Sequence, residues 1–243
     1  MTEAREARLV GDFGATHARL GLSGRRGRLQ LERSYLCAGF SGLTEVIRHY
    51  YSDIGLATAE QPRQAALAIA APLLSDTVRM TNLDWSFSAA ATRRELGLQR
   101  LRLLNDFTAL ALALPRLLPS QRRQVGGGMP VARSVVGLIG AGSGLGVSGL
   151  VPAGDGWVAL GTEGGHTSFS PRDERELDIL RYAMAQHPHV SFERLVSGPG
   201  LELSYLALLH RAGRPAHALP APEITRRALE GSDAVCLQAL ETF

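Results

Sequence analysis

Residues 8–19 of the chain read RLVGDFGATHAR, an apolar run followed by a turn of small residues and by a second strand-like run, Ala18–Leu22. Such a hairpin brings backbone N–H groups close to phosphate oxygens, because small residues leave the backbone accessible. Asp12 ends the first run and could hold Mg²⁺ through water, since this ion keeps most of its hydration shell. Thr16 adds a hydroxyl donor. Taken alone, the stretch leaves open an ordinary hairpin with an aspartate in its turn.

The remaining chain alternates between strand-like and helical patterns. Apolar residues recur at helical spacing over residues 43–50, whereas residues 29–36 alternate as a half-buried strand does. This alternation predicts an α/β fold with a sheet covered on its faces. Further strands are expected at 8–11, 18–22, 65–70, 101–104, 134–139 and 157–160, and further helices at 88–96, 106–114 and 233–243.

The segment over residues 118–133 is rich in Arg, Gly and Pro and is expected to link two parts of the chain. We therefore predict two domains, over residues 1–116 and 117–243. No internal repeat recurs at the period of a solenoid.

The chain contains 243 residues and no lysine. This excludes every mechanism that requires a lysine: the Walker A loop, the strand lysine of protein kinases and Schiff-base chemistry on pyridoxal phosphate. A chain of this kind must bind nucleotide phosphates with backbone amides, hydroxyls, arginine and metal.

The charge and the apolar runs exclude other classes. A net charge of +3 with arginines scattered along the chain argues against nucleic-acid binding, and the cluster Arg25-Arg26-Gly27-Arg28 is typical of a solvated turn. The runs Ala65–Leu74 and Ala109–Leu114 are too short to span a bilayer. Residues 1–8 are charged, unlike a signal peptide. Cys37 and Cys236 offer neither a disulfide framework nor a zinc set, so we expect a cytoplasmic protein.

A second glycine-rich loop, GAGSGLG over residues 140–146, follows an expected buried strand. Its glycines permit close approach of phosphates. No lysine follows, and the strand-like run Val147–Val151 replaces the helix that a dinucleotide fingerprint needs. An ordinary glycine-rich turn therefore remains open.

Polar residues occur at two further places. Asn105-Asp106 follows an expected strand, where ligands are generally bound in α/β sheets, although both residue types are also preferred helix N-caps. Glu163-Gly164-Gly165-His166 and Glu193 provide carboxylate and imidazole groups that can hydrogen-bond a ring of hydroxyls. For the Glu163–His166 stretch and for Glu193, the alternative is a routine surface loop.

These motifs, in this order, resemble those of bacterial glucokinase of the non-zinc group. The resemblance covers residues 8–243 and implies the two-domain α/β fold of the actin-like ATPase (ribonuclease H-like) superfamily, with ATP bound between a small first domain and a large second domain. The motifs are LVGDFGATHAR (9–19), MTN (80–82) with Trp85, LNDFTA (104–109), GAGSGLG (140–146), EGGH (163–166) and SGPG (197–200).

The resemblance implies ATP-dependent phosphorylation of glucose at its 6-hydroxyl, with Mg²⁺ as cofactor. Asp106 matches the catalytic aspartate, which takes the proton from that hydroxyl. Asp12 would hold Mg²⁺, usually through water. The matching sugar-binding residues are Asn105, Glu163, His166 and Glu193; the first phosphate motif contains Gly11, Asp12, Gly14, Ala15 and Thr16, and the second contains Gly142, Ser143 and Gly144.

The sequence departs from this family in three ways. Ala15 replaces a usual glycine, and a positive φ there would strain the backbone by roughly 1–2 kcal/mol. His17 replaces a usual asparagine. The family continues beyond the position of Phe243 with the segment that receives adenosine and with a returning C-terminal helix, so we expect a second domain that is incomplete.

The main alternative is a catalytically inactive sugar-binding fragment or regulator of the same family. Related repressors place a helix-turn-helix before the first phosphate motif, for which we expect no room ahead of Asp12. Related zinc-containing sugar kinases need a cysteine cluster, which two cysteines far apart in the sequence cannot provide. The expected partners are glucose and ATP, without nucleic acid or membrane. The family is often dimeric, which leaves a homodimer open.

Overall fold

The computed structural model describes residues 7–24, 27–81 and 83–243. The chain divides into two compact units, Met1–Gly127 and Gly128–Phe243. Asn82 of the quoted motifs, and Arg25 and Arg26 of the basic cluster, lie outside the described residues.

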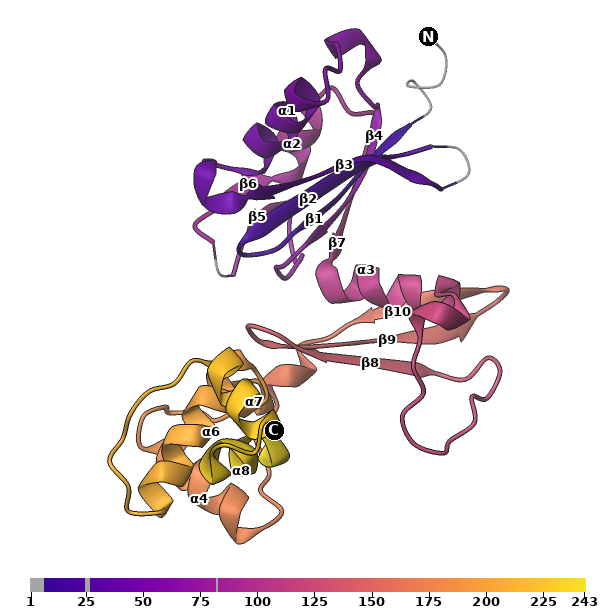
Figure 1. Ribbon diagram of the computed structural model, residues 1–243. Helices are drawn as coiled ribbons and strands as arrows, with labels where there is room; N and C mark the ends of the chain where they lie inside the picture. Colours follow the sequence, from indigo (N-terminus) through magenta and orange to yellow (C-terminus); the bar gives the residue numbers. More distant parts are fainter. Residues whose placement is uncertain (1–6, 25–26, 82) are drawn as a thin grey trace. The chain divides into compact units, whose positions relative to one another are not determined.

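The first unit is built on a five-stranded sheet, whose strands are β1 (Arg8–Phe13), β2 (His17–Ser23), β3 (Leu29–Leu36), β4 (Gln64–Ile69) and β7 (Arg100–Asn105). The strand order is β3-β2-β1-β4-β7: β1, β2 and β3 form an antiparallel meander, and β4 and β7 run parallel to β1 (Figure 1). The register aligns Phe13, Ile69 and Asn105, so the carboxyl ends of the three parallel strands meet at one edge.

Two helices, α1 (Leu43–Asp53) and α2 (Ala89–Glu95), lie over one face of this sheet (Figure 1). The apolar stripe predicted for α1 is buried against the sheet, and the unit's core consists chiefly of this stripe and the facing strand residues. Core members include Leu9, Phe13, Leu20, Val46, Ile47, Tyr50, Leu67 and Ile69. Helix α3 (Asp106–Ala113) begins where β7 ends.

One prediction for the first unit needs correction, and one element was missed. The half-buried alternation of β3 is wrong: Leu29, Leu31 and Leu36 are all exposed. This strand is the edge of the sheet, its pairing with β2 is irregular between Leu20 and Leu22, and Leu31 has a φ of 52°, which breaks the alternation. The short hairpin of β5 (Thr77–Arg79) and β6 (Ser86–Ser88) was not predicted, because three-residue strands carry no readable period.

The second unit contains a three-stranded antiparallel sheet and a group of helices. The sheet has the order β10-β9-β8, with β8 (Val136–Ala141), β9 (Leu145–Ala153) and β10 (Gly156–Gly161). The expectation of a buried strand before the glycine-rich loop is wrong, since Ile139 of β8 is 68% exposed. Ile139, Val158 and Leu160 share one face of this sheet, and all three are exposed.

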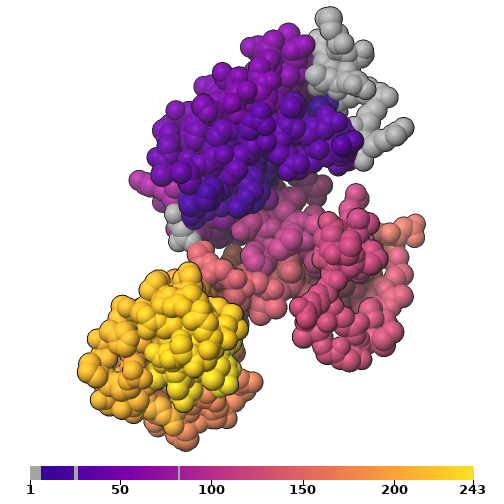
Figure 2. Space-filling view, viewed as in Figure 1, coloured from indigo at the N-terminus to yellow at the C-terminus, as the bar shows by residue number. Residues whose placement is uncertain are grey.

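The helices of the second unit pack into one body, drawn from orange to yellow in Figure 2. Their shared core includes Ile179, Tyr205, Leu208, Leu209, Ile224 and Cys236. Within the described ranges, no helix is long and apolar enough to cross a membrane. The sheets and helices confirm the predicted α/β class. The helices are α4 (Glu174–Met184), α5 (Phe192–Leu195), α6 (Gly198–Arg211), α7 (Ala221–Leu229) and α8 (Ala234–Thr242).

Candidate active site

Asp106 begins helix α3 directly after Asn105, the last residue of β7. The Asn105 side chain caps the helix, since its Oδ1 accepts a hydrogen bond from the Thr108 N–H at 3.1 Å. Its Nδ2 donates to Asp106 Oδ1 at 2.9 Å. The capping alternative therefore holds for Asn105, but it does not explain the carboxylate of Asp106.

The Asp106 carboxyl has the environment of a proton acceptor. Burial raises its pKa above the usual value, and the negative charge of Asp12 raises the pKa further, against the lowering effect of hydrogen bonds such as that from the Phe107 N–H. Asn105 Nδ2 and the Phe107 N–H both donate to Oδ1, and neither bond engages Oδ2. A raised pKa makes the carboxylate a stronger base.

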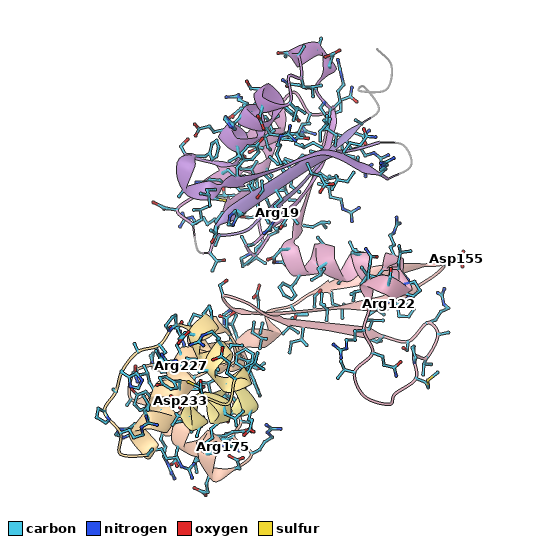
Figure 3. The ribbon with its side chains drawn as sticks, viewed as in Figure 1. Arg19, Arg122, Asp155, Arg175, Arg227 and Asp233 are labelled. Carbon is cyan, nitrogen blue, oxygen red and sulfur yellow. The ribbon has the colours of Figure 1, made fainter. Side chains whose placement is uncertain are left out.

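Asp12 lies at the carboxyl end of β1, close enough to Asp106 for its charge to act there. Its Oδ2 lies 3.0 Å from the guanidinium of Arg19, which projects from β2 (Figure 3). The exposed fractions of these side chains are 47% and 63%, so the ion pair is solvated and contributes little to stability. No cluster of three or more potential metal ligands occurs within the described residues.

The turn over residues 14–16 joins β1 to β2, and the Gly14 N–H donates to the carbonyl of His17 at 3.0 Å. Among the described residues that are not glycine, Leu31 and Arg133 have positive φ and Ala15 does not. The strain considered for Ala15 is therefore absent. Gly11 faces the core, where an added Cβ would lie 2.7 Å from Leu20 Cδ2, so packing explains that glycine.

The second glycine-rich loop connects β8 to β9, and other elements of the second unit hold it in place. The Gly142 N–H donates to the Gly144 carbonyl at 2.8 Å, and the Gly142 carbonyl accepts from the N–H of Gly198 at 2.8 Å. The Leu145 N–H donates to Glu193 Oε2 at 2.9 Å. Ser143 lies at the tip of the loop and lines a cavity of about 370 Å³ together with Glu193.

The side chains of Glu163, His166 and Glu193 lie close together in the second unit. His166 Nε2 lies 3.8 Å from Glu163 Oε2, and His166 Nδ1 lies 3.7 Å from Glu193 Oε1. These distances are too long for hydrogen bonds, so the three groups keep donors and acceptors for a ligand. Gly165 lies against β9, where an added Cβ would overlap the Leu145 carbonyl.

Three contributors to these turns were not predicted as site residues. Cys37 lies behind the first turn: its N–H donates to the Thr16 carbonyl at 2.9 Å, and its thiol donates to the Gly14 carbonyl at 3.5 Å. Arg19 pairs with Asp12, and Gly198 binds the second loop. Arg19 and Gly198 stand in quoted motifs, which is a usable signal, whereas a lone cysteine gives none.

The fold is that of the actin-like ATPases, which a solved glucokinase structure shares. A family model described as glucokinase matches residues 9–243. The chain belongs to the glucokinase family, which confirms the resemblance found in its motifs.

Curated relatives and a solved structure agree with this assignment. The glucokinase of Chromobacterium violaceum is 50% identical over 236 residues, which cover 97% of this chain and 67% of that protein. The protein named "Bifunctional protein glk" of Burkholderia orbicola is 50% identical over 237 residues, 97% of this chain and 36% of the relative. The crystal structure of a glucokinase from an Antarctic psychrotroph has a TM-score of 0.82 and 31% identity, and it covers 98% of this chain and 74% of that one. The chain thus spans 36% of the length of the bifunctional relative.

Proposed function

We propose that the chain transfers the γ-phosphoryl group of ATP to the 6-hydroxyl of glucose, with Asp106 as the general base. The observation that carries this proposal is the half-buried position of the Asp106 carboxyl, whose partial burial raises its pKa and whose Oδ1 is held by Asn105 and Phe107. Half-identity to a protein named glucokinase supports glucose as the acceptor.

Asp106 would accept the proton of the 6-hydroxyl on Oδ2 as the hydroxyl oxygen attacks the γ-phosphorus. The new P–O bond forms while the bond to the oxygen of the leaving ADP breaks. Hydrogen bonds to Oδ1 from Asn105 and Phe107 fix the orientation of the carboxylate. Phosphoryl transfer has a loose transition state, so positioning carries most of the catalysis and the base contributes about 10²–10⁴-fold.

The sugar hydroxyls would be bound by Glu163, His166 and Glu193, with Asn105 contributing beside the base. The side chains of Glu163 and His166 are 65% and 60% exposed, so a ligand can reach them. A carboxylate accepts two hydroxyl hydrogen bonds, and an imidazole both donates and accepts. The cluster therefore suits a polyol better than a flat or apolar ligand.

The phosphates would be bound at the two turns by backbone N–H groups and hydroxyls, since the chain has no lysine. The residues concerned are Gly14, Ala15 and Thr16 in the first turn, Gly11 in the preceding strand β1, and Gly142, Ser143 and Gly144 in the second turn. Asp12 fits a water-mediated Mg²⁺, because its carboxylate is half exposed. The cation would also offset the negative charge that Asp12 places near Asp106. When bound, the ion neutralises charge on the phosphates. Cytoplasmic location and a homodimer stay predictions from the sequence.

The test is glucose-dependent formation of ADP by residues 1–243 with Mg-ATP. We expect activity in the unmodified chain and its loss in Asp106→Asn, while calorimetry detects nearly unchanged glucose binding. Asp155→Asn is the matched control, because Asp155 is exposed at the tip of the β9–β10 hairpin (Figure 3).

Two outcomes would count against parts of this proposal. Equal loss of binding and transfer in Asp106→Asn would assign that residue a structural role. Glucose binding without any ADP formation would favour the alternative of a catalytically inactive sugar-binding protein of the same family.

A further inference from the structure

The two carboxylate oxygens of Glu193 serve different parts of the second unit. Oε2 accepts a hydrogen bond from the Leu145 N–H at 2.9 Å, at the end of the glycine-rich loop. Oε1 faces the His166 imidazole and lies 3.7 Å from its Nδ1. One side chain therefore touches both the loop that would bind phosphate and the group that would bind sugar.

The glycine at position 144 provides the space for this contact. An added Cβ there would overlap Glu193 Oε2 and would lie 3.0 Å from Glu193 Cδ. Gly144 has no positive φ, so backbone conformation does not require a glycine. The approach of the Glu193 carboxylate is the observed feature that does.

Helix α5, which carries Glu193, is also bonded through its backbone to the residues that follow Glu163–His166. The Phe192 N–H donates to the Thr167 carbonyl at 2.9 Å, and Ser168 and Ser191 form an isolated β-bridge. On its other side the loop is bound to Gly198, the first residue of α6. The backbone on both sides of the Glu193 side chain is thus held by hydrogen bonds. A shift of the Glu193 carboxylate would therefore act on the loop directly, through the bond to the Leu145 N–H.

We infer that Glu193 is a positioning residue for the glycine-rich loop and couples occupation of the sugar site to the arrangement of residues 140–146. A hydroxyl that binds Oε1 would fix the carboxylate, and Oε2 would then hold the Leu145 N–H more firmly. The coupling to sugar rests on the proposed function. The contact between Glu193 and the loop does not, since the structure contains the hydrogen bond between them.

The first experiment measures amide hydrogen exchange of a peptide spanning residues 141–148 in the ligand-free chain. Glu193→Ala should accelerate exchange at Leu145 by about ten- to a hundredfold, because a hydrogen bond to a charged acceptor is lost. Glu193→Gln should restore most of the protection, since an amide oxygen can still accept. Gly144→Ala should expose the same amide, whereas Gly137→Ala, which has open space for a Cβ, is the matched control.

Unchanged exchange at Leu145 in Glu193→Ala overturns the inference, whether or not glucose binds. The second experiment adds glucose and follows the loop and residues 163–166 together. Protection of both segments in the unmodified chain, with loop protection lost in Gly144→Ala and kept in Gly137→Ala, supports the coupling.

Protection of residues 163–166 alone overturns the coupling and leaves the proposed function standing. No protection of either segment contradicts glucose binding, and with it both the proposed function and the sugar-dependent coupling. A merely structural role of Glu193 would not make the loop respond to sugar. The affinity for a non-hydrolysable ATP analogue, measured with and without glucose, gives the same coupling from the other side, because coupling between two ligands is reciprocal.

Discussion

The two glycine-containing turns of this chain are held in place by different kinds of contact. In the first, the turn over residues 14–16 is closed by backbone bonds, and the Cys37 thiol donates to its Gly14 carbonyl. In the second, the Glu193 carboxylate occupies the space beside Gly144, and Gly165 lies against the Leu145 carbonyl. The first turn therefore tolerates side chains at its glycine, whereas the second depends on glycines for close packing.

The carboxylates of the two units differ in the same sense. In the first unit, partial burial and the negative charge of Asp12 both oppose ionisation of Asp106 and raise its pKa. Glu163 and Glu193 flank an imidazole, and each carboxylate faces a different ring nitrogen of His166. In the first unit, the unfavourable energy is therefore electrostatic and lies at Asp106. In the second unit, the constraint is the close packing around Gly144 and Gly165.

The largest effect is expected for Gly165→Ala. An added Cβ would overlap the backbone carbonyl of Leu145, which cannot rotate away as a side chain can. The free energy of unfolding should fall by about 3 kcal/mol, measured by urea denaturation. Gly156→Ala is the control, since its added Cβ would lie 3.8 Å from the Ala153 carbonyl. Equal stability of the two variants would show that the second loop is not packed as described.

The matched pair Gly144→Ala and Gly14→Ala tests the comparison directly. Gly144→Ala should reduce the free energy of unfolding by about 1–2 kcal/mol, because the Glu193 carboxylate must move. Gly14→Ala should change it by no more than about 0.5 kcal/mol, since the new Cβ would lie 3.5 Å from the His17 carbonyl without backbone strain. Urea denaturation measures both, and a larger loss for Gly14→Ala would reverse the comparison.

Cys37→Ala should loosen the first turn. It removes a buried thiol and its bond to the Gly14 carbonyl, so we expect a loss of about 1 kcal/mol and faster amide exchange at residues 14–17. Cys37→Ser should recover part of the protection, because its hydroxyl can donate to the same carbonyl. Cys236→Ser, in the core of the second unit, is the control. It should leave exchange at residues 14–17 unchanged, and acceleration there would show a global rather than a local effect.

Much of the fold could be predicted because its signals are local. The strand residues before Gly14 and Asp106 form apolar runs that end in polar residues, and the α1 stripe repeats at helical spacing. The exposure of β3 could not be predicted, since the sequence does not show which strand lies at an edge. The β5–β6 hairpin is too short for any period to be read.

The candidate site divides in the same way. The position of Asp106 directly after a strand could be predicted, whereas its role as the base is implied by the family resemblance and stays a prediction. Glu163 and His166 are close in sequence. The bond from Leu145 to Glu193 joins residues 48 positions apart, and the thiol of Cys37 reaches a carbonyl 23 positions away. Such contacts depend on how elements pack, which residue spacing alone does not specify.

The smallest effect, and the one that tests the electrostatic half of the comparison, is the pH dependence of stability in Asp106→Asn. Burial and the charge of Asp12 raise the folded-state pKa of Asp106 above its unfolded value. The group therefore contributes stability below the unfolded pKa, and this contribution is lost as pH rises through the folded pKa. Removing the charge should relieve that cost at neutral pH.

We accordingly expect Asp106→Asn to be more stable than the unmodified chain at pH 7, and the difference to shrink as the pH approaches about 4, where aspartate is normally half protonated. The amide oxygen can keep the bonds from Asn105 and Phe107, so geometry should change little. Urea denaturation at both pH values measures the difference. A variant less stable at pH 7 would mean that the favourable interaction of the Asp106 carboxylate with the first turn of α3 outweighs the cost of its burial. The ionised Asp106 would then not destabilise the first unit.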